Sequence, residues 1–370
     1  MPEATGEEFT GPPVRFLVNS AFHRDGTTEE RRYGAELVSH LEAVADVRER
    51  PLPAARQSSF QEWMGDQTVG RGRERSEHLL SLTNRGPVLA RRHVVVIHDV
   101  FAIDHPHWFP LRVGAKRAAS LRARLRSAEL VVTSTDEVAE RVRELTGWGV
   151  PVVTVPPAPS DDWVAAPSEP LWVGDHELRR GGFVLGVSDG DRRSNEENLV
   201  AAHRLLSEDL RARFPLVLVT PTTARASDDP FVLRVSGVDS TELARLRSAA
   251  SVAVVATLDE GSGMLALDAL AAGIDLVVSD VTVHRDLCRD DATYVDPESS
   301  VSIASGLTVA LTFPTDADGR DYRALRIRRQ FTWARSASLL VEAVADLEDP
   351  SGDDRGPDGL VSDLVRPRLA

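Results

Sequence analysis

Short apolar runs rich in β-branched residues alternate with amphipathic stretches along most of the chain. Ten of these runs predict buried parallel strands, at residues 14–19, 93–99, 130–134, 152–155, 183–187, 216–220, 232–235, 252–256, 276–279 and 293–295. Five of the stretches between them predict helices, at residues 29–44, 136–145, 197–206, 240–250 and 301–311. Repeated strand–helix units predict an α/β fold built from doubly wound parallel sheets.

The chain has 370 residues, which suits two domains that each bury a core of their own. Residues 156–170 are rich in Pro, Ser and Asp and show no periodicity, so we interpret them as an interdomain linker. The predicted organisation is a first Rossmann-like domain over 1–165 and a second over 166–330. The polar tail at 349–370 is predicted to be disordered. In such folds ligands bind at the carboxyl ends of the strands, so we expect a site in the cleft between the two sheets.

The net charge of −14 argues against non-specific binding to nucleic acid. The single cysteine, Cys288, excludes an internal disulfide and fits a reducing compartment. The N-terminal residues lack the apolar segment of a signal peptide, and no apolar run approaches the ~18 residues of a membrane-spanning helix. These features favour a cytoplasmic protein.

One basic segment stands apart from this acidic background. Residues 111–127 contain five arginines and Lys116, the only lysine of the chain, but no acidic residue. A solvated helix face is the simpler interpretation, because the segment has no Trp or Phe to anchor it in lipid. The alternative is a peripheral contact with anionic lipid headgroups or a lipid-linked acceptor at the inner face of the membrane.

The most informative stretch is residues 252–273, VAVVATLDEGSGMLALDALAAG. A predicted strand is followed by Asp259 and Glu260, then by the turn Gly261–Ser262–Gly263, and a helix is predicted to begin at Met264. A strand, a glycine turn and a helix N-terminus together direct backbone N–H groups at an anion. An acidic residue just before such a turn is suited to accept hydrogen bonds from sugar hydroxyls instead. The combination predicts a nucleotide-sugar site.

Five segments in order resemble motifs of the retaining family-4 glycosyltransferases of GT-B fold. They are an HD pair followed by HPHWF in 81–109, VVTSTDEVAERV at 131–142, a strand and loop at 183–206, the DEGSG segment with its following ATYVDP at 259–297, and QFTWARSASLLVEA at 330–343. The likeness is closest to the branch that adds mannose- or rhamnose-like sugars to bacterial polysaccharides and glycolipids. It implies a helix over 331–348 that crosses back to the first domain.

The resemblance also implies an activity, which is transfer of a hexose or deoxyhexose from a nucleotide diphosphate sugar with retained anomeric configuration. It implies no metal or cofactor, and a cell-surface glycan or lipid-linked acceptor bound by the first domain. By the same likeness Glu260 would hold hydroxyls of the donor sugar. The site residues it implies beside Glu260 are Gly261, Ser262, Gly263 and Met264 at the sugar and diphosphate, Asp268 at the ribose, Arg192 or Arg193 at the pyrophosphate, and His98 with Asp99 across the cleft.

The chain departs from the family pattern at several of these positions. The family's Arg-Lys-Asn clamp is Arg193-Ser194-Asn195 here, so its lysine is lost, and two acids, Glu196 and Glu197, follow. Asp268 replaces a glutamate. These departures motivate an alternative function, a catalytically silent GT-B protein that acts as partner or scaffold of an active transferase.

Simpler interpretations of single residues also stay open at this point. Glu260 could be an exposed loop acid, His98 a core histidine and the two arginines a solvated loop. Three other histidines lack the spacing of a metal site, and we interpret them as structural or surface residues; they are His105, His107 and His284.

Overall fold

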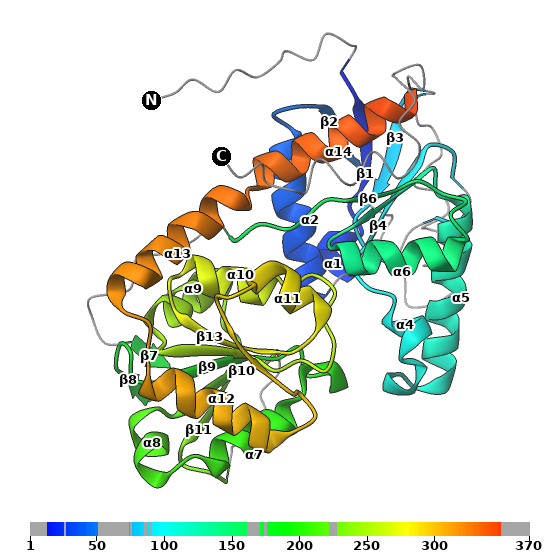
Figure 1. The fold of residues 1–370 in the computed structure, drawn as a ribbon. Coiled ribbons are helices and arrows are strands. Elements are labelled where there is room, and N and C mark those ends of the chain that lie inside the picture. Colours follow the sequence, from blue (N-terminus) through cyan, green and yellow to red (C-terminus); the bar gives the residue numbers. More distant parts are fainter. Residues whose placement is uncertain are drawn as a thin grey trace, which may run out of the picture.

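A computed structural model describes residues 13–25, 27–50, 74, 76–84, 87–88, 90–160, 171–173, 176–221 and 228–348. Two six-stranded, all-parallel sheets dominate it (Figure 1). In spatial order the first sheet comprises β2 (Asp46–Arg50), β1 (Arg15–Asn19), β3 (His78–Ser81), β4 (His93–Ile97), β5 (Leu130–Thr133) and β6 (Val152–Thr154). The second comprises β11 (Val232–Val235), β10 (Leu216–Val219), β9 (Val184–Val187), β12 (Val252–Val255), β13 (Asp275–Ser279) and β14 (Thr293–Val295). A short antiparallel pair, β7 (Leu171–Val173) and β8 (His176–Leu178), precedes the second sheet.

The two parallel sheets confirm the predicted fold class. All ten predicted strands are present, with ends within two residues of the prediction. The pattern missed β2 and β3 of these sheets, and also the short pair β7 and β8. Strand β2 is a polar edge strand whose five residues are DVRER. An edge strand with one neighbour can face solvent on both sides, so it shows no buried run.

The first sheet is accompanied by α1 (Phe22–Asp25), α2 (Thr28–Leu41), α4 (Phe101–Asp104), η1 (Pro106–Trp108), α5 (Leu111–Ser127) and α6 (Asp136–Thr146). The second is accompanied by η2 (Arg192–Ser194), α7 (Glu196–Leu205), α8 (Glu208–Arg213), α9 (Ser240–Ala249), α10 (Met264–Ala271), α11 (Thr282–Cys288) and α12 (Ser300–Thr312). Apolar side chains of α9 and α10 form one core against this second sheet, and those of α7 and α12 form another. The sheet is thus buried on both faces, which explains its nearly continuous apolar strands.

The last two helices, α13 (Ala317–Gln330) and α14 (Trp333–Glu348), run from the second half of the fold to the first (Figure 1). Helix α13 packs on α10, whereas α14 packs on α2. Trp333 and Leu340 are buried in the same core as Tyr33, with the Trp333 and Tyr33 rings edge to face at 5.3 Å. Helix α14 therefore joins the core of the first sheet. Among the described residues, no helix is long and apolar enough to cross a membrane.

Candidate active site

The glycine turn predicted from the sequence links β12 to α10. Gly263 is the residue before the helix and has a positive φ of 65°, a conformation that side chains other than hydrogen disfavour. Glu260 Oε1 accepts N–H groups of the three residues that follow it, at 3.0 Å from Gly261, 3.3 Å from Ser262 and 3.4 Å from Gly263. The carboxylate is 3% exposed and lies at the N-terminus of α10. In this conformation the anion that the turn binds is its own glutamate.

Arg193 supplies the positive charge of this region. Its Nη1 lies 3.6 Å from Glu260 Oε1, and its Nη2 donates to Asp189 Oδ2 at 3.1 Å. Burial by itself would raise the pKa of Glu260, but Arg193, His284 and the turn N–H groups outweigh it and hold that pKa below its usual value. Of the two candidate arginines, the structure therefore places Arg193 beside Glu260, whereas Arg192 is exposed.

The residues after Arg193 have structural partners. Asn195 adopts a left-handed conformation and donates from Nδ2 to the carbonyls of Ala256 at 2.8 Å and Pro297 at 2.7 Å. Glu196 pairs with Arg234 at 2.6 Å, so its charge is already compensated. Of the two glutamates, only Glu197, which is exposed, has no ion-pair partner among the described residues.

The first domain touches the turn directly. A Cβ placed on Gly261 would lie 2.2 Å from the carbonyl oxygen of His98, so only glycine fits here. Thr135 Oγ1 donates to the Gly261 carbonyl at 3.1 Å. His105 Nε2 lies 2.9 Å from Asp259 Oδ2, and its ring stacks on Trp108 at 4.1 Å. Sequence reasoning missed this His105–Asp259 contact, because the pair is separated by 154 residues.

His98 and Asp99 follow β4, as expected, but they present different groups to the turn. The His98 ring is buried, with Nε2 3.0 Å from the Leu82 carbonyl, Nδ1 3.5 Å from Ser134 Oγ, and its edge against Tyr33 at 4.8 Å. Both ring nitrogens thus have partners inside the first domain, and the backbone carbonyl is the group of His98 at Gly261. Asp99 is half-buried, and burial raises its pKa.

Asp268 lies in α10, one turn beyond Met264, and its side chain is 1% exposed. Its Oδ2 pairs with Arg32 of α2 and Arg247 of α9, and its Oδ1 accepts the Ser160 N–H at 3.0 Å. These partners outweigh burial and hold the pKa of Asp268 below its usual value. These bonds leave one acceptor position on Oδ1, but the side chain is so deeply buried that ribose could reach it only if a neighbouring group moved. Arg32 and Arg247 were not predicted, since nothing in their own segments marks them as partners of α10.

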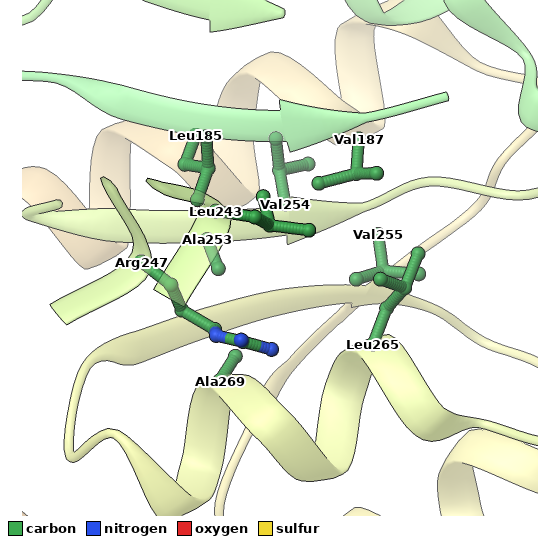
Figure 2. A pocket seen from close by; sticks show the side chains of 9 residues that line it. All are labelled: Leu185, Val187, Leu243, Arg247, Ala253, Val254, Val255, Leu265 and Ala269. Atoms are coloured by element: carbon green, nitrogen blue, oxygen red, sulfur yellow. The ribbon is translucent and has the colours of Figure 1, made fainter. Parts of the chain in front are cut away.

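Two cavities lie near this ion-pair cluster. The smaller, about 20 Å³, lies between β9, β12, α9 and α10 and has room for about one water molecule (Figure 2). Figure 2 shows Arg247 at its edge, with Leu265 and Ala269 on α10. The larger, about 960 Å³, is lined by Asp268, Ser160 and residues of α13. Neither is lined by Glu260. Within the described part of the chain, no group of three or more His, Cys, Asp or Glu residues is arranged to hold a metal ion.

Several known proteins resemble this chain. No family model matches the chain. The chain is 25% identical over 270 residues to the O-antigen chain mannosyltransferase B of Escherichia coli, covering 70% of this chain and 71% of that protein. Its structure is similar to the sucrose-phosphate synthase of Thermosynechococcus elongatus, with a TM-score of 0.68 and 16% identity over 90% of this chain and 99% of the other. The chain has the GT-B fold of these glycosyltransferases. A UDP-forming α,α-trehalose-phosphate synthase of Burkholderia vietnamiensis shares the same fold, with a TM-score of 0.64 and 13% identity over 91% and 99% of the two chains.

The GT-B fold explains why the candidate site residues converge. The glycine turn follows β12 of the second sheet, whereas His98 and Thr135 follow β4 and β5 of the first. The carboxyl ends of both sheets therefore meet at Gly261, where open α/β sheets bind their ligands.

Proposed function

We propose that this glycosyltransferase moves a hexose or deoxyhexose, with mannose as the first candidate, from a nucleotide diphosphate sugar to a hydroxyl of a cell-surface glycan or glycolipid, with retention. The observation that carries the proposal is the buried Glu260 carboxylate at the start of α10, beside Arg193. The mannosyltransferase likeness supports the donor sugar. Retention is supported by a solved trehalose-6-phosphate synthase, described as a study of glycosyl transfer with retention, that has a TM-score of 0.66 and 12% identity over 90% and 99% of the two chains.

In the proposed reaction the bond between the anomeric carbon and the diphosphate oxygen breaks, and its electron pair stays on the diphosphate. The acceptor oxygen bonds to the same face of the anomeric carbon, and its proton passes to the departing diphosphate. Arg193 and the N-terminus of α10 stabilise the negative charge on the leaving group. Glu260 accepts hydrogen bonds from donor hydroxyls at Oε2, because Oε1 holds the turn N–H groups and Oε2 accepts only the Thr257 hydroxyl, at 3.4 Å, among the described residues.

Donor entry needs the two domains to separate. Glu260 is buried, and Arg32 of the first domain pairs with Asp268 of the second. Breaking the Arg32 contact would free a lone pair of Asp268 for a ribose hydroxyl. Closure would then return the first domain to Gly261 and exclude water from the reacting atoms.

A thermal-shift series with UDP, GDP, ADP and dTDP tests the donor site. One nucleotide is expected to stabilise the protein by about 2.7 kcal/mol at a hundred times its Kd, because it binds only the folded state. Arg193→Ala should abolish the shift, whereas Arg192→Ala, which removes an exposed neighbour, should largely keep it. If no nucleotide changes the Tm, the silent-partner function is favoured instead.

The basic segment supports a peripheral membrane contact as part of this function. It forms α5, on which Arg112, Lys116 and Arg117 are exposed. Leu111 and Val113 are 86% and 42% exposed on the same helix, so apolar side chains lie beside the cations. Anionic headgroups attract such a face, at roughly 1 kcal/mol for each Lys or Arg near the surface.

Flotation with vesicles tests this contact. The protein is expected to float with vesicles of phosphatidylglycerol and phosphatidylcholine at low salt, and to remain unbound with phosphatidylcholine alone. Replacing Arg112, Lys116 and Arg117 by Gln should strongly reduce flotation, because it removes three exposed charges. The buried residues of α5 are unchanged, and the contact of Arg117 with the Phe109 ring is lost. Equal flotation with both vesicle types, or with neither, contradicts the contact.

A further inference from the structure

A series of hydrogen bonds links the Glu260 carboxylate to α11. Oε2 of Glu260 accepts the Thr257 hydroxyl at 3.4 Å. The carbonyl of Thr257 accepts the Ser279 hydroxyl at 2.6 Å, and the carbonyl of Ser279 lies 3.0 Å from Nδ1 of His284. The series therefore runs from the end of β12, through the end of β13, to the first turn of α11.

All four residues of this series are buried. Glu260 is 3% exposed and Thr257 is 6% exposed, whereas Ser279 and His284 are fully buried. In such surroundings a hydrogen bond is stronger than it is in water. The Ser279 hydroxyl has one proton, and its contact with the Thr257 carbonyl is shorter than its contact with the Val255 carbonyl, at 3.4 Å. The proton of Ser279 therefore belongs to the series.

The ring of His284 acts as a neutral donor at the end of the series. Because the Ser279 carbonyl can only accept, Nδ1 carries the ring proton. Nε2 is buried and has no hydrogen-bond partner among the described residues. Burial lowers the pKa of His284, although the charge of Glu260 acts in the opposite direction. The ring is therefore neutral at pH 7, with its tautomer set by Ser279.

Apolar contacts fix the same helix against the glycine turn. A Cβ built on Gly263 would lie 2.2 Å from Cδ1 of Leu287 and 3.3 Å from Cγ1 of Val283. Val283 precedes His284, and Leu287 follows it by three positions on the same side of α11. The helix that carries His284 therefore packs directly on the turn whose N–H groups bind Glu260.

The orientation of the Glu260 carboxylate decides which oxygen the donor meets. The terminal torsion of a glutamate side chain is broad, so a carboxylate held at one oxygen can rotate. The turn N–H groups hold Oε1, and among the described residues only the Thr257 hydroxyl holds Oε2. In the proposed function Oε2 binds a hydroxyl of the donor sugar, so a rotated carboxylate would misplace the sugar for reaction.

We propose that His284 is a positioning residue for this reaction, which acts through Ser279 and Thr257 to fix the carboxylate that the glycine turn binds. The imidazole holds the Ser279 backbone, and the hydroxyls of Ser279 and Thr257 carry this constraint to Oε2. This inference rests on the proposed function and adds to its site three residues that act without touching the donor.

The test measures turnover of the full chain as release of nucleoside diphosphate from UDP-, GDP-, ADP- and dTDP-mannose, with octyl mannoside or water as acceptor. His284→Phe removes the Nδ1 donor but keeps a ring, and it is expected to lower kcat about tenfold while the Kd of the nucleoside diphosphate stays within about twofold. His284→Asn, whose amide can replace the Nδ1 donor, should recover most of this loss. Thr257→Val tests the other end of the series, with Thr257→Ser as its rescue.

His203→Phe is the matched control. His203 is also fully buried in the second domain, and its Nε2 lies 2.9 Å from the Phe214 carbonyl. Phe214 precedes β10, so this contact lies at the opposite edge of the sheet from the glycine turn. His203→Phe removes the same kind of hydrogen bond, so it should lower the free energy of unfolding as His284→Phe does but leave kcat unchanged.

Combination with Glu260→Gln separates positioning from a structural role. If His284 acts through Glu260, His284→Phe should lower kcat far less in the Glu260→Gln background than in the wild type, because coupled residues are not additive. A structural residue would lower kcat by the same factor in both backgrounds. If His284→Phe does not fold, Thr257→Val is used in the same comparison.

The possible failures of the two proposals are distinguishable. Equal factors in both backgrounds overturn the role of His284, as does wild-type kcat in both His284→Phe and Thr257→Val. Wild-type turnover in Glu260→Gln alone would instead refute the proposed function, and this inference with it. Absence of turnover with all four sugar nucleotides, together with absence of nucleotide binding, would do the same.

Discussion

Glu260→Gln is expected to lower kcat/KM for sugar transfer by roughly 10²–10³-fold, the range seen when one preorganised polar group is removed from an active site. The amide keeps an oxygen that can accept the N–H groups of Gly261, Ser262 and Gly263, so the turn should persist. It loses the negative charge that faces Arg193 at 3.6 Å. Initial rates with the donor identified by thermal shift measure the effect.

The glutamine variant separates chemistry from folding, which an alanine variant would not. Glu260→Ala would leave three buried N–H groups without their acceptor, at a cost of about 1–3 kcal/mol for each unsatisfied group. Glu197→Gln is the matched control, because Glu197 is exposed on α7 and the same charge is lost there. Full activity of Glu260→Gln, with nucleotide affinity unchanged, would remove Glu260 from the reaction.

The sequence predicted those parts of the fold whose pattern is local. Strands such as β9 and β12 are buried on both faces, so their apolar runs are nearly unbroken. The glycine turn was equally predictable, because a strand, an acid, small residues and a helix start within a dozen positions. Strand β2 was not, since its polar residues pair with β1 at the sheet edge and carry no periodic signal.

The contacts around the site depend on residues that are distant in sequence. Arg32 and Asp268 are 236 positions apart, and His105 and Asp259 are 154 apart. The partner of such a residue can be identified only from the three-dimensional arrangement of the two sheets. The roles of Glu260, Asp268 and Arg193 remain predictions, but the geometry sharpens them. Glu260 now binds its own turn, and Asp268 now joins the two domains.

Asp268→Asn is expected to destabilise the protein by about 3–5 kcal/mol, because it leaves two arginines facing each other without the carboxylate that both pair with. The midpoint of urea unfolding measures the loss. Asp280→Asn is the matched control. Asp280 also pairs with an arginine, but both side chains are about half exposed, so little change is expected there.

The pH dependence of the stability difference between wild type and Asp268→Asn identifies the cause of that difference. The pKa of Asp268 is lowered in the folded state, so its stabilising effect is fully present above the unfolded value of about 3.9 and is lost as the pH falls through the folded value. The gap between wild type and Asp268→Asn should therefore be constant from pH 7 to 5 and narrow below about pH 4. A gap that stays constant to pH 3 would mean that packing, rather than the ion pairs, is responsible.

Because Arg32 belongs to the first domain and Arg247 to the second, Arg32→Ala should weaken only the contact between domains, which is the contact that donor entry has to break.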